Sequence, residues 1–177
     1  MKHRRFAPLL ATLAAAGYAV EGAIVVRAPQ PDHGWHASGY AVEGAFVVAL
    51  LASLPLVAVL RSGRGRLSAA AVWFARCGFA AMLVSATASL AAGGDELGPA
   101  FFLGVLAALV GLIVLSAIAV RTRALGWWQA PIVAAGLVLS IALGDHGGGI
   151  LFASAWAAVG LALHDTPETE AVASATA

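Results

Sequence analysis

Six long apolar runs, separated by short polar connections, constrain this chain of 177 residues more than any other feature. A helix rises about 1.5 Å per residue, so about 20 apolar residues cross the hydrocarbon core of a bilayer. None of the runs alternates apolar and polar residues as the strands of a membrane barrel do. The predicted spans are approximately residues 7–26, 38–60, 69–92, 100–120, 127–143 and 148–163. The sequence therefore predicts an all-α fold, a polytopic transmembrane bundle of about six helices.

Composition supports a membrane protein with a single domain. Hydrophobic residues make up 61% of the chain and charged residues 11%, which leaves too few polar side chains to cover a soluble globule. We expect one transmembrane helical domain over residues 1–163 and a short disordered acidic tail over residues 164–177. The last two spans are short, so they form either a tight transmembrane hairpin or a re-entrant pair.

The basic residues predict the orientation of the chain. Eight of the ten Lys and Arg residues lie before the first span, between the second and third, or between the fourth and fifth. These segments share one side of the membrane if all the spans cross it. Because basic residues gather on the cytoplasmic side, we expect that side, with both chain ends, to be cytoplasmic. We predict a multi-pass protein of the cell membrane.

A short internal repeat has one copy in the first span and one in the second. GYAVEGAIVV at 17–26 recurs as GYAVEGAFVV at 39–48, with nine of ten positions identical. The first span runs outward and the second inward, so Glu21 and Glu43 each lie about 7 to 8 Å inside the outer boundary. A local duplication that merely supplies a usable helix face explains the repeat equally well.

Glu21 and Glu43 are the main candidate site residues, as proton-binding or ion-binding groups. Ionisable side chains inside a membrane are costly, and by default they indicate a functional site. Two carboxylates at one depth can share a proton, pair with Arg27 or bind a cation. The alternative is that both stay protonated, or reach toward the outer water, and only hold two helices together.

The sequence contains no strong metal, cofactor or catalytic motif. His33, His36, Asp145 and His146 are weak metal-ligand candidates in predicted outer connections, since His and carboxylate groups bind zinc, but no third ligand has a fixed position. The three histidines are alternatively sensors of external pH. No Ser, His and Asp set is placed to act together. We therefore expect no metal, no cofactor and no enzyme activity.

Small residues recur four apart in several spans, as in Gly104 with Ala108 and Gly136 with Ser140. Such stripes allow close helix packing, either inside one bundle or between subunits. We expect the lipid bilayer as the principal partner, and a homo-oligomer or another membrane protein as a possible second partner. The net charge of +1 gives no support for nucleic-acid binding.

The segment 97–163 carries a resemblance. It reads LGPAFFLGVLAALVGLIVLSAIAVRTRALGWWQAPIVAAGLVLSIALGDHGGGILFASAWAAVGLAL, with a glycine-punctuated span, a short basic turn, a tryptophan-led span and a final hairpin. In these features it resembles the C-terminal half of small uncharacterised multi-pass membrane proteins of actinobacteria. The resemblance implies a membrane bundle, and it implies no catalytic residues.

Two functions are compatible with the sequence. The first is a noncatalytic membrane component, such as a partner subunit, a sensor or an envelope protein, whose small-residue faces and loops contact other proteins. The alternative is a small protein that transports protons, ions or a solute, with Glu21 and Glu43 as the binding carboxylates near the outer face.

Overall fold

In the computed structural model, the described part of the chain forms six α-helices. The structure describes residues 6–27, 37–61, 65–92, 98–122, 128–143 and 146–164. The helices are α1 (Ala7–Arg27), α2 (Ala37–Val59), α3 (Arg66–Ala92), α4 (Gly98–Arg121), α5 (Gln129–Ala142) and α6 (Gly149–His164). The prediction of an all-α bundle is confirmed, and each helix begins and ends within three residues of the predicted apolar run. The predicted tail from residue 165 onward lies outside the described residues.

The four longer helices, α1 to α4, are long and apolar enough to cross a membrane. The apolar parts of α5 and α6, Pro131–Ala142 and Gly149–Ala162, are shorter. Large apolar side chains cover the outside of the bundle: Val84, Leu103 and Leu161 are 67%, 67% and 68% exposed. An apolar surface of this extent suits lipid and not water, so the protein is a membrane protein.

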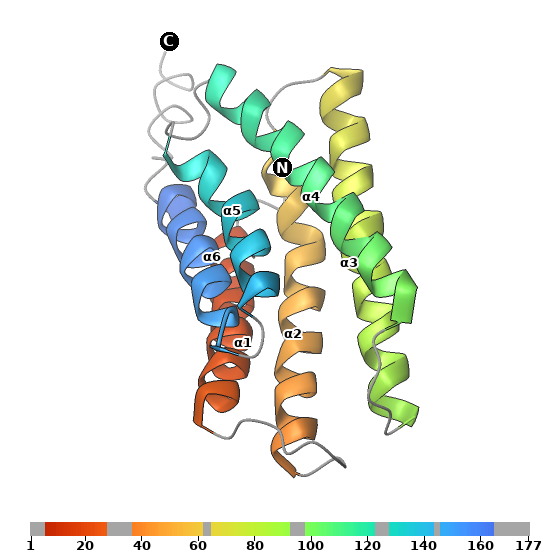
Figure 1. The fold of residues 1–177 in the computed structure, drawn as a ribbon. Coiled ribbons are helices and arrows are strands. Elements are labelled where there is room, and N and C mark those ends of the chain that lie inside the picture. Colours follow the sequence, from red (N-terminus) through yellow and green to blue (C-terminus); the bar gives the residue numbers. More distant parts are fainter. Residues whose placement is uncertain are drawn as a thin grey trace.

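The helices form a closed ring. Each helix packs against the next one in the chain, and α1 packs against α6, which closes the ring. Figure 1 shows α1, α5 and α6 grouped on one side of α2 and α3 on the other side, with α4 running diagonally from the α3 side across α2. The last residues of α1 and α3 and the first residues of α2 lie at the same end of the bundle, at the bottom of Figure 1. We call this the predicted outer end.

The α3–α4 contact is the tightest part of the ring. A Cβ atom added to Gly78 would collide with the backbone of Gly104 and Ala108. A Cβ atom added to Gly111 would collide in the same way with the backbone of Ala75. The small residues thus bring the two backbones into direct contact, as in closely packed membrane helices.

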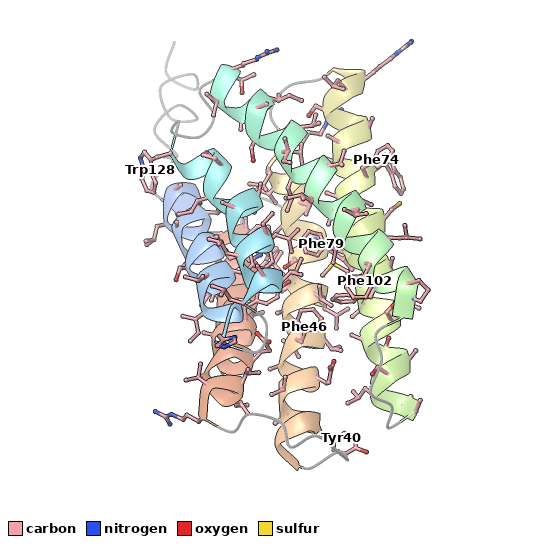
Figure 2. All side chains as sticks on the ribbon, in the orientation of Figure 1. Tyr40, Phe46, Phe74, Phe79, Phe102 and Trp128 are labelled. Atoms are coloured by element: carbon pink, nitrogen blue, oxygen red, sulfur yellow. The ribbon has the colours of Figure 1, made fainter. Side chains whose placement is uncertain are left out.

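Aromatic side chains lie near both ends of the bundle. Trp128 and Tyr40 are 51% and 49% exposed, and Figure 2 places them at opposite ends. This arrangement matches the aromatic belts that lie at the two interfaces of a membrane.

Candidate functional site

A cavity of about 360 Å³ lies inside the ring, and residues from all six helices line it. Its polar lining residues are Glu21, Glu43, Tyr18 and Ser140. Apolar side chains form most of the remaining wall: Val42, Phe46, Met82, Phe101, Phe102, Leu137, Ile141 and Phe152. We call it the acidic cavity.

Glu21 reaches the cavity from α1 and contacts the first residue of α6. Its Oε2 atom occupies the place where a side chain on Gly149 would begin, and the Tyr18 carbonyl oxygen is 2.7 Å from the same position. Only glycine leaves room for this approach. The start of a helix carries a partial positive charge, so it is a favourable neighbour for a carboxylate.

The turn before α6 makes this contact possible. Gly147 has a φ of +80°, a left-handed conformation that glycine adopts without strain. On α1, a Cβ atom added to Gly22 would lie 2.8 Å from the Ile150 nitrogen and 3.0 Å from the Gly147 carbonyl oxygen. Glycines on both sides therefore hold the α5–α6 turn against the Glu21 segment.

Glu43 reaches the same cavity from α2. Its Oε2 atom is buried and has no hydrogen-bond partner among the described residues. Glu21 and Glu43 thus line one cavity from two helices that pack against each other. A carboxyl inside a membrane-spanning segment is costly unless it is paired, so two carboxyls that line one cavity favour a positively charged or hydrogen-donating species there.

An aromatic layer closes the cavity on the side of the bundle interior. Each of its three rings lies three residues, about 4.5 Å along its helix, farther into the bundle than a residue at the cavity. The pairs are Tyr18 with Glu21, Phe46 with Glu43, and Phe152 with Gly149. The Tyr18 ring centroid is 6.0 Å from that of Phe46 and 4.6 Å from that of Phe152. We call these three rings the aromatic layer.

The hydroxyl of Tyr18 is anchored below the cavity. It lies 3.5 Å from the Ser53 Oγ atom, and Ser53 donates its own proton to the Ala49 carbonyl at 2.8 Å. Tyr18 is therefore the donor to Ser53. Tyr18 and Ser53 are 2% and 0% exposed, so this pair fixes the layer inside the bundle.

The aromatic contacts continue beyond the layer. Phe46 contacts Phe101 with ring centroids 6.1 Å apart, and Phe101 contacts Phe102 at 5.9 Å. On the other side, Phe152 contacts Trp156 at 5.9 Å. A continuous row of rings thus crosses α6, α1, α2 and α4 beside the two carboxyls.

The structure brings together two of the three principal candidates from the sequence. Glu21 and Glu43 line one cavity, whereas Arg27 is exposed at the end of α1 and does not line it. Of the weak metal candidates, His146 is exposed, and His33, His36 and Asp145 lie outside the described residues. Within the described ranges, no group of three or more His, Cys, Asp or Glu residues is placed to hold a metal ion.

Neither the aromatic residues that line the cavity nor the contact of Glu21 with Gly149 was predicted from the sequence. The signal for the layer was present, because Tyr18 and Phe46 stand three residues from the two glutamates. Phe101, Phe102 and Phe152 come from distant helices, and nothing local in the sequence associates them with the repeat.

Comparison with known protein families, curated proteins and solved structures finds no match to this chain. The site must therefore be interpreted from its own geometry and chemistry.

Proposed function

We propose that this protein is a noncatalytic membrane protein that binds and transports a small positively charged species at Glu21 and Glu43. The observation that carries the proposal is that both carboxyls line one cavity between the six helices. Ionisable groups inside membrane proteins typically line cavities and pathways for ions or protons. Two carboxyls attract protons and cations and repel anions.

The positive-inside rule supports a location near the outer face of the cell membrane. Arg61, Arg66 and Arg121 lie at the helix ends opposite the cavity, whereas Arg27 lies at the predicted outer end. Basic residues favour the cytoplasmic side. In this orientation the cavity belongs to the outer half of the bundle, the aromatic layer lies on its inner side, and both chain ends are cytoplasmic.

A partner subunit, sensor or envelope protein is the second candidate. In that function the small-residue faces and the loops would contact the partner, yet many of the small residues pack within the bundle. Gly104 and Ala108 meet Gly78, and a Cβ atom added to Gly136 would lie 3.0 Å from the Ala155 side chain. The packing therefore leaves less small-residue surface for docking and favours the cavity as the functional feature.

Electrical recording from reconstituted vesicles on a solid support tests the proposal. Steps in the concentration of protons, Na⁺, K⁺ or an alkylammonium ion should produce a transient current for at least one species. The Glu21→Gln/Glu43→Gln double variant should abolish that current. Ser154→Ala is the matched control, because Ser154 is exposed on α6 and, among the described residues, bonds only to the Ile150 carbonyl of its own helix. A current unchanged in the double variant, or absent for every species, would favour the partner-subunit function.

A further inference from the structure

The walls of the acidic cavity indicate which class of cation fits it. Apart from Glu21, Glu43, Tyr18 and Ser140, the side chains that line it are apolar, and five of its residues carry aromatic rings. These rings belong to Tyr18, Phe46, Phe101, Phe102 and Phe152. An aromatic face attracts a cation within about 6 Å of the ring centroid. The cavity therefore offers two kinds of attraction to a positive charge, and a large apolar area beside them.

The size of the cavity is wrong for a bare inorganic ion. A volume of about 360 Å³ falls within the range of about 300 to 1,000 Å³ that is typical of small-molecule sites. Ca²⁺ and Mg²⁺ require about six or more oxygen ligands in close contact. The four polar side chains here lie on a wall that is otherwise apolar, so they cannot surround such an ion.

The charge of the cavity excludes other solutes of similar size. An anion would be repelled by Glu21 and Glu43. A neutral apolar molecule would leave the carboxyls of Glu21 and Glu43, which line the cavity, without a counter-charge. A cation with an apolar portion satisfies the carboxyls and the aromatic wall at the same time.

We propose that the acidic cavity is a binding site for a small organic cation, a substituted ammonium ion with an aromatic or other bulky apolar group. The charged nitrogen lies beside Glu21 and Glu43, and the apolar group lies against the aromatic layer and the Phe101 ring. This proposal rests on the proposed function, because it names the substrate class of the same two carboxyls.

Four probes separate charge from apolar contact. Benzyltrimethylammonium has both, tetramethylammonium has the charge alone, benzyl alcohol has the ring alone, and Na⁺ is a small inorganic cation. Binding to the purified full-length protein in detergent is measured by isothermal titration calorimetry. Benzyltrimethylammonium should bind at least about tenfold more tightly than tetramethylammonium, since cation–π and apolar contacts add to the charge interaction. Benzyl alcohol and Na⁺ should show no saturable binding at the same concentrations.

Substitutions on and off the cavity wall give the matched controls. Phe46→Leu should weaken benzyltrimethylammonium binding several-fold, because it removes a ring from the wall. Phe74→Leu should leave binding unchanged, since Phe74 is 56% exposed on α3 and points away from the cavity (Figure 2). Both variants replace a phenyl ring with leucine, and thermal unfolding verifies that each is folded.

The outcomes distinguish this inference from the proposed function. Equal affinity for benzyltrimethylammonium, tetramethylammonium and Na⁺, lost in the Glu21→Gln/Glu43→Gln variant, overturns the organic-cation site and leaves the cation-binding function intact. Binding of benzyltrimethylammonium that ignores both the glutamine and the Phe46 substitutions overturns both proposals. Selective binding that falls with each cavity substitution, and not with Phe74→Leu, supports the inference.

Discussion

The two copies of the ten-residue repeat have nearly the same sequence and very different surroundings. Tyr18 in the first copy is 2% exposed, whereas its counterpart Tyr40 is 49% exposed. Gly22 packs against the turn before α6, whereas a Cβ atom on its counterpart Gly44 would meet nothing within 4 Å. The two glutamates, by contrast, line the same acidic cavity.

Chain direction explains this difference. The tyrosine precedes the glutamate by three residues in both copies, but α1 and α2 run in opposite directions. Tyr18 therefore lies on the interior side of Glu21, and Tyr40 lies near the predicted outer end. When a repeat lies on two antiparallel helices, its central residue has the same depth in both copies. A residue before it lies on the interior side in one copy and on the outer side in the other. This places the carboxyls together and leaves one tyrosine to form the aromatic layer.

The largest expected effect concerns the two tyrosines. Tyr18→Ala removes a fully buried ring, and we expect it to lower the free energy of unfolding by about 3 kcal/mol or more. Tyr40→Ala removes a half-exposed ring and should cost less than about 1 kcal/mol. Unfolding in mixed detergent micelles, followed by circular dichroism, measures both. Equal losses would show that the two copies have equivalent environments, and so would break the comparison.

The two glycines should differ in the same direction. Gly22→Ala forces a methyl group against Ile150 and Gly147, and overpacking of this kind costs about 1 to 3 kcal/mol. Gly44→Ala meets open space and should change the free energy of unfolding by less than about 1 kcal/mol, in the stabilising direction, because alanine favours the helix. The same unfolding measurement compares the stabilities of the two variants. A larger loss for Gly44→Ala than for Gly22→Ala would contradict the α1–α6 contact.

The glutamates should behave alike where the tyrosines and glycines differ. We expect Glu21→Gln and Glu43→Gln each to weaken benzyltrimethylammonium binding about tenfold, which corresponds to about 1.4 kcal/mol. The reason is that each variant removes one of two negative charges from the same cavity. Calorimetric titration compares the variants, with Ser154→Ala as control. A loss confined to one glutamate would mean that only one copy of the repeat serves the site.

The smallest effect concerns the partner of the buried tyrosine. Ser53→Ala leaves the Tyr18 hydroxyl without the acceptor that it has in the structure, and we expect a loss of about 1 kcal/mol. Adding Tyr18→Phe should recover part of that loss, because no polar group is then left unpaired. A double-mutant cycle measures the coupling. A coupling energy of zero would show that the hydrogen bond contributes nothing to the aromatic layer.

The fold and the central pair of residues could be predicted from the sequence, and the rest of the site could not. Apolar run length fixes the helices, and the repeat together with chain direction fixes the common depth of Glu21 and Glu43. The positions of residues in the sequence did not determine whether Arg27 pairs with the two glutamates, because the rotation of a helix about its axis decides which residues face inward. The contact of Glu21 with Gly149 depends on how closely α6 approaches α1, which is a property of tertiary packing.

The central claim is that Glu21 and Glu43 face one cavity as an interacting pair. Infrared titration of the carboxyl bands in the reconstituted protein tests it directly, with Glu21→Gln and Glu43→Gln to assign each band. We predict that replacing either glutamate changes the titration of the other, and that benzyltrimethylammonium perturbs both bands. Two bands that titrate independently, each unaffected by the loss of its partner, would contradict the paired site.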